Sequence, residues 1–228
     1  RSEKGSVMSE QTVTPKGKRY VSERGGFKLN ANPAIGEVVP RAKIRPERSA
    51  AGFAHEPLAS KYGPEAAAKK IGEMVKAFIP GTITTTLLAQ GGHHGMSLVH
   101  VWFGANFPLF RHSHPRYGDC LYYVIAGEIL LGQQRLGAGS TFFVPNGQPY
   151  KYTAGPAGVE LLEFRAGGGD PQAPGMQLDE SSFEAIDKII KESYDNDEAW
   201  VPPKKMGDTA IRQALIEGRL PEQTALEF

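Results

Sequence analysis

The sequence predicts an all-β core, an antiparallel barrel or jelly roll, with helical segments before and after it. Between residues 82 and 164, short apolar or β-branched runs follow one another at short intervals, with turn residues between them. No helical repeat interrupts these runs, whereas amphipathic helical patterns occur on both sides of them. We therefore predict an N-terminal arm and helix over residues 1–80, a barrel over 81–168, and a linker with C-terminal helices over 169–228.

Composition and charge restrict the class of protein. The 228 residues include 26 Lys and Arg against 25 Asp and Glu, so overall charge gives no reason to expect a nucleic acid or an anionic membrane as partner. Cys120 is the only cysteine, which excludes an intramolecular disulfide and suits a reducing compartment. The sequence has no run of about 18 apolar residues and no signal-peptide pattern. We expect a soluble, cytoplasmic protein.

The N-terminal 60 residues are polar, and prolines recur in them too often for a helix, so they predict an arm. A helix is predicted from Pro64 to about residue 79, because proline suits a first helical turn and the segment has a single apolar stripe. That stripe consists of Ile71, Met74, Val75 and Phe78. Pro80 and Gly81 end the helix.

The strands of the barrel are predicted from apolar runs bounded by turn residues. They cover residues 82–88, 97–103, 121–125, 129–131, 141–144, 150–153 and 159–164. Ala126 and Gly127 predict a turn that makes a hairpin of 121–125 and 129–131. After a glycine-rich linker, a capping box from Ser181 to Glu184 predicts one helix, and a second is expected from Asp208 to near Gly218.

A pair of histidines precedes the predicted hairpin. His112 and His114 are two residues apart, so on an extended strand both imidazoles leave from the same face. Two imidazoles on one face are a candidate metal-ligand pair. We therefore expect the hairpin to carry a ligand pair.

These residues and those that follow resemble the two sequence motifs of the cupin family, over residues 97–164. The positions that match are two histidines, a proline and four glycines, namely Gly104, His112, His114, Gly127, Gly139, Pro145 and Gly147. The resemblance implies a cupin barrel, a double-stranded β-helix or jelly roll. It also implies a metal site, in which Tyr150 replaces the histidine of the second motif and Ala154 replaces its asparagine.

The glutamate position of the first motif has two candidates. Counting forward from His114 gives Asp119, and counting back from Gly127 gives Cys120. An inward Asp119 would complete a two-histidine, one-carboxylate set typical of non-haem iron, whereas an inward Cys120 would offer a thiolate that suits zinc or iron. We expect Cys120 to face inward, because Asp119 follows a glycine in a natural turn and a carboxylate is costly inside a barrel.

Tyrosines provide further candidates. In the thiol dioxygenases, an iron-dependent branch of the cupins, a cysteine takes the glutamate position and can cross-link to a nearby tyrosine. The resemblance therefore makes Tyr150 and Tyr152 candidate catalytic residues. His100 is an alternative third imidazole on the strand 97–103, or a hydrogen-bonded core residue. We expect His93 and His94 to be solvated loop residues, and His55 to have no role.

The resemblance favours a metal-dependent cupin enzyme, a dioxygenase-type oxidoreductase acting on a small organic substrate. The expected metal ligands are His112, His114, Cys120 and Tyr150, and the expected cofactor is a divalent metal, iron first, with zinc, manganese or nickel as alternatives. The other hypothesis is a metal-free cupin that binds a small molecule, as a sensor or an isomerase. Terminal arms of cupins often pack across a partner subunit, so we expect a homodimer.

Overall fold

The computed structural model describes residues 19–220, apart from 25, 55, 91–93 and 171. The chain divides into two compact units, residues 1–33 and 34–228. In the first unit, β1 (Tyr20–Arg24) and β2 (Phe27–Ala31) form an antiparallel hairpin within the predicted arm. Both the fold and the candidate site described below belong to the second unit.

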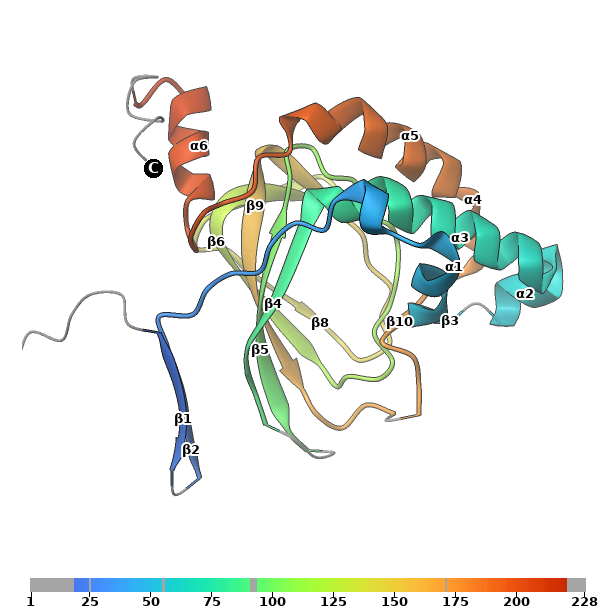
Figure 1. The fold of residues 1–228 in the computed structure, drawn as a ribbon, viewed down its shortest axis with the longest axis horizontal. Helices are drawn as coiled ribbons and strands as arrows, with labels where there is room; N and C mark the ends of the chain where they lie inside the picture. Colours follow the sequence, from blue (N-terminus) through green and yellow to red (C-terminus); the bar gives the residue numbers. More distant parts are fainter. Residues whose placement is uncertain (1–18, 25, 55, 91–93, 171, 221–228) are drawn as a thin grey trace, which may run out of the picture. The chain divides into compact units, whose positions relative to one another are not determined.

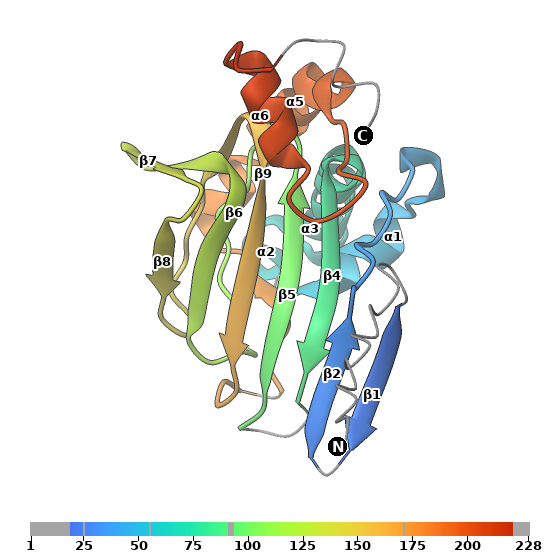
Figure 2. The same cartoon turned by 90° about the vertical axis from the view of Figure 1, so that its left-hand side faces the viewer.

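The second unit is built on a six-stranded antiparallel sheet (Figures 1 and 2). Its strands are β4 (Thr82–Ala89), β5 (Met96–Phe103), β6 (Cys120–Leu131), β7 (Gln134–Gly137), β8 (Thr141–Val144) and β9 (Thr153–Ala166). The order across the sheet is β4-β5-β9-β6-β7, and β8 pairs with β6. Figure 2 shows β6, β9, β5 and β4 side by side in this order.

The alternation of side chains along the central strands separates an inner from an outer face. On β5, Val101 and Phe103 line a central cavity, and the intervening Trp102 points to the other face. Segments outside the strands close the barrel through isolated bridges between Pro108 and Thr153, His112 and Tyr150, and Ser113 and Gln177. The inner face is therefore enclosed partly by irregular chain.

The predicted hairpin at residues 121–131 is wrong. One continuous strand, β6, covers the whole segment, and its register shifts between Val124 and Ala126 and again between Gly127 and Ile129. Gly127 has a φ of 72°, and a Cβ there would lie 2.1 Å from the carbonyl oxygen of Gly158. The glycine therefore permits an irregularity within the strand, where it had suggested a turn.

The histidine pair also does not lie on such a hairpin, because residues 110–114 are outside the named strands and are held by isolated bridges. Tyr150 likewise occupies a bridge, and the strand predicted at 150–153 begins only at Thr153, as β9.

The helices are α1 (Pro46–Ser49), α2 (Glu56–Tyr62), α3 (Pro64–Phe78), α4 (Glu180–Glu184), α5 (Ile186–Asn196) and α6 (Thr209–Ile216). Short 3-10 turns occupy Arg41–Lys43, Ala50–Gly52, Ile79–Gly81 and Asp197–Ala199. Figure 1 shows α3 and α5 beside each other at one end of the barrel, and an ion pair joins Lys70 to Asp187 across them. The first predicted C-terminal helix is split at Ala185, and its capping box joins Asp179 to Ser182.

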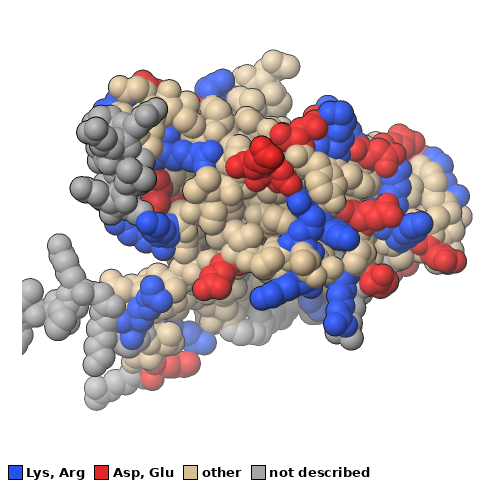
Figure 3. Space-filling model, turned by 45° about the horizontal axis from the view of Figure 1, so that its top comes forward, with Lys and Arg blue, Asp and Glu red and all other residues tan. Residues whose placement is uncertain are grey.

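Charged side chains of both signs are interspersed on the face shown in Figure 3. Several are paired, as Arg41 is with Asp197 at 2.8 Å. This mixture agrees with the near-equal numbers of acidic and basic residues in the sequence. Among the helices of the described residues, none has the length and apolar character needed to cross a membrane.

Trp200 closes one end of the barrel core and explains the first motif glycine. Its indole Nε1 donates a hydrogen bond to the carbonyl oxygen of Ala105 at 3.0 Å, and its ring packs against Phe107. A Cβ on Gly104 would lie only 2.2 Å from the indole. The missing side chain of Gly104 therefore provides the space that the indole occupies.

We expect Gly104→Ala to lower the free energy of unfolding by about 1–3 kcal/mol, because the added methyl group overpacks the core against Trp200. Denaturant unfolding followed by tryptophan fluorescence measures the change. Gly137→Ala is the matched control, since a Cβ there meets no atom within 4 Å, and it is expected to stay within about 0.5 kcal/mol of the wild type. Equal unfolding midpoints for the two variants would contradict this packing argument.

Candidate functional site

The candidate site is a cavity of about 350 Å³ between the inner face of the sheet, the end of α3 and the irregular segments that close the barrel. Most of its wall is apolar and comes from Phe53, Val75, Phe78, Ile79, Val101, Phe103, Leu109, Phe110 and Met176. The polar groups in the wall are Thr82, Thr84, His112, His114, Tyr150, Tyr152, Glu163 and Arg165. A mostly apolar wall with a few converging polar groups is typical of small-molecule sites.

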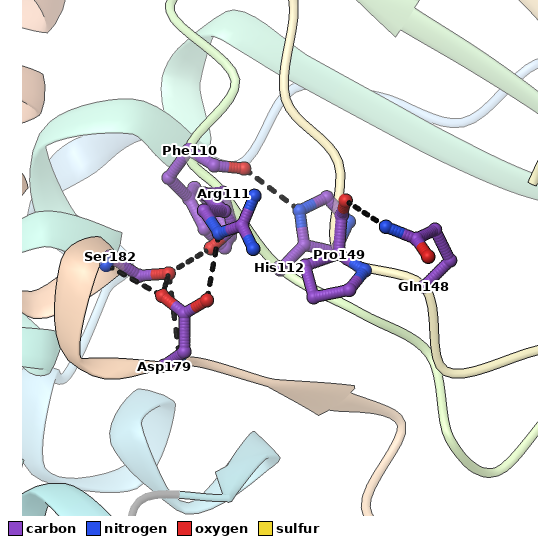
Figure 4. A network of polar contacts seen from close by, with 7 residues as sticks. All are labelled: Phe110, Arg111, His112, Gln148, Pro149, Asp179 and Ser182. Atoms are coloured by element: carbon purple, nitrogen blue, oxygen red, sulfur yellow. Dashed lines mark hydrogen bonds and ion pairs between the residues drawn. The ribbon is translucent and has the colours of Figure 1, made fainter.

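The first histidine has a fixed tautomer. Its Nδ1 lies 2.9 Å from the carbonyl oxygen of Phe110 (Figure 4), and since a carbonyl can only accept, His112 carries its proton on Nδ1. Burial, together with the neighbouring His114, lowers the pKa of His112 to about 3. The ring is therefore neutral near pH 7, with an unprotonated Nε2.

The second histidine is fixed in the same way by a different segment. The Nδ1 of His114 donates to the carbonyl oxygen of Gly175 at 2.7 Å. Burial lowers the pKa of His114 as well, and the charge of Arg165 adds to this effect. This ring is also neutral and also has its lone pair on Nε2.

The two Nε2 atoms face each other at 3.1 Å. With both ring protons on Nδ1, neither atom has a hydrogen to donate, so the contact brings two lone pairs together. Two nitrogen ligands at about 2.0–2.1 Å from one metal ion, at right angles, would be separated by roughly 3 Å. The donor pair therefore fits a bound cation.

Tyrosine hydroxyls extend this group. The hydroxyl of Tyr150 lies 3.3 Å from the Nε2 of His114 and 2.7 Å from the hydroxyl of Tyr122. Burial raises the pKa of Tyr150 and of Tyr122 above their ordinary values, so both phenols are protonated near neutral pH. Tyr150 can therefore donate to His114 while Tyr122 donates to Tyr150.

Tyr152 differs from its neighbours because its hydroxyl lacks a hydrogen-bond partner among the described residues, although the side chain is only 4% exposed. The ring lines the cavity, and burial raises the pKa of Tyr152 well above its ordinary value. An unpaired buried hydroxyl is costly. A bound molecule with an acceptor oxygen would satisfy it.

Two charged residues of the site were missed by the sequence reasoning. Glu163 and Arg165 lie on β9, and both line the cavity. The Nε of Arg165 donates to Glu163 Oε2 at 3.0 Å, and its Nη2 contacts the same oxygen. Burial lowers the pKa of Arg165, but the charge and hydrogen bond of Glu163, together with Tyr122 and Tyr117, outweigh it and raise the pKa above its ordinary value. The sequence pattern that could have identified them is strand alternation. Glu163 and Arg165 follow the buried Leu161 by two and four residues, so both side chains face the inside of the barrel.

Of the two candidates for the glutamate position, Cys120 is buried and Asp119 is exposed. Cys120 is 3% exposed, whereas Asp119 is exposed and accepts a hydrogen bond from the backbone of Asn146 at 2.9 Å, as expected. The sulfur of Cys120 lies 3.7 Å from the carbonyl oxygen of Gly118, and burial raises the pKa of the thiol to about 11. In the described part of the chain, no group of three His, Cys, Asp or Glu side chains is arranged to hold a metal. A ligand role for Cys120 stays a prediction.

His100 is not part of the site, because it points to the outer face of the sheet. Its Nε2 lies 2.9 Å from Glu160 Oε2, and both side chains are fully buried. Glu160 also accepts hydrogen bonds from the backbone of Gly207 at 2.7 Å, just before α6, and of Thr209 at 2.8 Å, its first residue. The pair therefore fastens α6 to the barrel. His94 is exposed, and His93 and His55 lie outside the described residues.

The segment 175–182, which we call the strap, holds the histidine segment in place. Its Gly175 fixes His114, and Gln177 forms two backbone hydrogen bonds with Ser113, of 3.0 and 2.9 Å. Figure 4 shows the far end of the strap, where Ser182 Oγ donates to the carbonyl oxygen of Arg111 at 2.6 Å and Asp179 pairs with the Arg111 side chain at 2.7 Å. The strap also contributes to the cavity wall. It contains β10 (Met176–Gln177), which pairs with β3 (Phe53–Ala54), and both Met176 and Phe53 line the cavity.

No family model and no curated protein matches the sequence, but solved structures do. An RmlC-like cupin from Shewanella frigidimarina is 26% identical over 38% of this chain and 77% of its own, with a TM-score of 0.32. The polyketide cyclase RemF from Streptomyces resistomycificus is 20% identical over 50% of this chain and 83% of its own, with a TM-score of 0.36.

A chain from structures of the DMSP lyases RdDddP and RnDddQII is 23% identical over 40% of this chain, with a TM-score of 0.36. The present chain spans 50% of the length of that chain. The structure has the antiparallel barrel and the flanking helices that the sequence predicted. Its interior contains the two histidines that the first motif indicated.

The buried pair on the outer face leads to a test of stability. Burial by itself raises the pKa of Glu160, but hydrogen bonds from His100, Gly207 and Thr209 outweigh it and lower the pKa. A lowered pKa in the folded state stabilises the fold above the unfolded value of about 4.3, and this contribution is lost as the pH falls through the folded pKa. We expect Glu160→Gln to lower the free energy of unfolding by about 3 kcal/mol at pH 7.

The difference between Glu160→Gln and wild type should shrink as the pH is lowered below about 4, where the wild-type carboxylate is also neutralised. Urea unfolding across this range measures it. Glu73→Gln, at an exposed position of α3, serves as the control and should differ little from wild type at any pH. A difference for Glu160→Gln that is independent of pH would show that the charge of Glu160 does not stabilise the fold.

Proposed function

We propose that the protein is an enzyme that holds a divalent metal ion at His112 and His114 and acts on a small organic substrate in the cavity. The observation that carries this proposal is the 3.1 Å approach of two unprotonated Nε2 atoms, each ring being held by a hydrogen bond from its Nδ1 to a backbone carbonyl. A histidine that binds metal commonly donates its other N–H to such a partner, which fixes both its tautomer and its orientation.

The residues that would hold the metal are His112, His114 and, as a third donor, Tyr150. Imidazole with oxygen donors suits iron, zinc or nickel, and we propose iron first, with zinc, manganese or nickel as alternatives. When bound, such an ion supplies Lewis-acid polarisation of a substrate oxygen or, as iron, activation of oxygen in a dioxygenase-type reaction. The apolar wall excludes water from this region and so strengthens the polar contacts within it.

The other polar groups have roles that their protonation states define. The hydroxyl of Tyr152, which has no hydrogen-bond partner in the part of the chain that the structure describes, can donate to an acceptor oxygen of the substrate. Glu163 has one oxygen held by Arg165, which leaves Oε1 to accept a proton or a hydrogen bond from a ligand in the cavity. Tyr150 can pass on the hydrogen bond that it receives from Tyr122. Tyr152, Glu163 and Tyr150 can in this way orient a substrate next to the histidine pair.

A second candidate is a metal-free cupin that binds a small molecule. The specific observation in its favour is the hydrogen-bond chain from Tyr122 through Tyr150 to His114, which satisfies one of the facing lone pairs without a cation. In this case the cavity and Tyr152 would still recognise a ligand. Metal content therefore separates the two candidates.

We expect protein purified without added metal to contain a substantial fraction of one equivalent of a divalent transition metal, rising to about one equivalent after incubation with iron(II) or zinc(II). His112→Ala should reduce that content at least tenfold, because the variant retains only one imidazole at the site. Elemental analysis by mass spectrometry gives both the amount and the identity of the metal. His94→Ala is the control, since His94 is an exposed histidine that does not line the cavity.

Near-zero metal in the wild type, before and after incubation with iron(II) or zinc(II), would contradict the proposed enzyme and favour the metal-free candidate. A metal content that His112→Ala leaves unchanged would place the metal elsewhere in the chain. Circular dichroism of each variant verifies that it is folded, so that a loss of metal reports on the ligand.

A further inference from the structure

We infer that the cavity takes a ligand with an apolar body and an anionic head group, with the head bound by Arg165 and the body directed towards α3. This deepens the proposed function by naming a substrate class, and it rests on that function only in placing the substrate in the same cavity. Neither the sequence motifs nor the histidine pair indicate this class. The inference comes from the positions of charged and apolar groups along the barrel.

The sheet register places the two ends of the ligand. Val159 lies opposite Phe103, and Arg165 lies opposite Ser97, so six residues of β9 separate the two positions. At about 3.3 Å per residue, this separation is roughly 20 Å along the strand. Phe103 lies opposite Thr82, which follows α3 after one 3-10 turn, and the wall at that end is mostly apolar, with Phe78 and Ile79. The charged end and the apolar end of the cavity are therefore well apart.

The histidines lie between these ends, as a series of ring contacts shows. The ring of Phe78 of α3 is 5.2 Å from that of Phe110, which is 5.0 Å from that of His112. The rings of His112 and His114 are 4.7 Å apart, and the ring of His114 is 5.9 Å from that of Tyr117, over which the Arg165 guanidinium lies at 4.8 Å. A ligand extended from Arg165 to Phe78 would therefore pass the candidate metal site.

Arg165 is held in place and still has donors to spare. Its guanidinium lies 4.8 Å from the centre of the Tyr117 ring, and Glu163 takes the Nε–H and one N–H of Nη2. A guanidinium has five N–H donors, so three remain, and no acceptor for them occurs among the described residues. The side chain is only 15% exposed. Its spare donors can therefore bind a planar anionic group without the cost of ordering the arginine.

Arg165 also lines a second hollow, of about 660 Å³, at the end of the barrel away from α3. The wall of this hollow includes Arg116, Tyr117 and the glycines 167–169. It contains no Asp or Glu among the described residues that line it, so its charged side chains are two arginines. Arg165 therefore borders both hollows, so its remaining N–H groups can bind a head group while the apolar body lies inside the cavity.

Carboxylates and phosphates share the chemistry that a guanidinium recognises, so the test compares both. The probes are octanoate, its neutral analogue octanamide, and octyl phosphate, each titrated calorimetrically into the full chain as purified. We expect octanoate to bind at least tenfold more tightly than octanamide. Tighter binding of octyl phosphate than of octanoate would identify the anion as a phosphate ester and would equally support the inference.

The variant that tests Arg165 is the double substitution Arg165→Met with Glu163→Gln, because removing the arginine alone would leave a buried unpaired carboxylate. In this variant the preference for octanoate over octanamide should fall to about one. The matched control is Arg135→Met with Glu128→Gln, which removes an Arg–Glu pair that does not line the cavity. This control should keep the wild-type preference.

The inference is overturned if the wild type binds octanamide as tightly as octanoate, or if it binds neither anion. It is also overturned if the preference survives in the Arg165 double variant, since the carboxylate would then bind elsewhere, for example at a metal on the histidine pair. Metal content is measured on the same samples. Absence of metal would count against the proposed enzyme, and it would leave the preference for an anion as a separate result.

Discussion

The carbonyl oxygens of Phe110 and Gly175 determine the chemistry of the barrel interior, because each accepts the Nδ1 proton of one imidazole and so leaves both Nε2 atoms of the pair unprotonated and facing each other. Burial prevents either ring from relieving the contact by taking up a second proton near neutral pH. A bound cation, or a donor such as the hydroxyl of Tyr150, is what this arrangement can accommodate. Most of the site can be understood as support for these two rings.

That support comes from segments far apart in the sequence. The strap at 175–182 supplies the carbonyl that fixes His114 and also holds Ser113 and Arg111, so its position and the direction of the imidazoles depend on each other. The bridge between His112 and Tyr150 joins the two halves of the barrel at the same point. On the other face of the sheet, Glu160 fastens α6 without contributing to the cavity. The barrel thus has a buried, hydrogen-bonded carboxylate that stabilises the fold on one face, and a polar site for binding on the other.

The sequence predicted the barrel, the helix α3 and the histidine pair, because each depends on a local pattern of apolar periodicity or spacing. It failed where tertiary contacts overrule local signals. Gly127 suggested a turn but permits a register shift within β6, and Gly104 is explained by the indole of Trp200, about a hundred residues away in the chain. His100 could not be assigned from alternation alone, because its partner Glu160 belongs to another strand. Glu163 and Arg165 could have been predicted to face inward, because they alternate with the same spacing as buried apolar residues of the strand. They were missed because they belong to no recognised motif.

The most direct test of this account is the protonation state of the two rings in the full chain. A long-range proton–nitrogen correlation NMR spectrum of ¹⁵N-histidine-labelled protein at pH 7, after treatment with a chelator, distinguishes the tautomers of His112 and His114, and each assignment follows from the corresponding alanine variant. We expect both rings to carry their proton on Nδ1 and the Nε2 resonance of each to shift or broaden when a divalent metal is added. A ring protonated on Nε2, or Nε2 resonances that do not respond to iron(II), zinc(II), manganese(II) or nickel(II), would contradict this expectation.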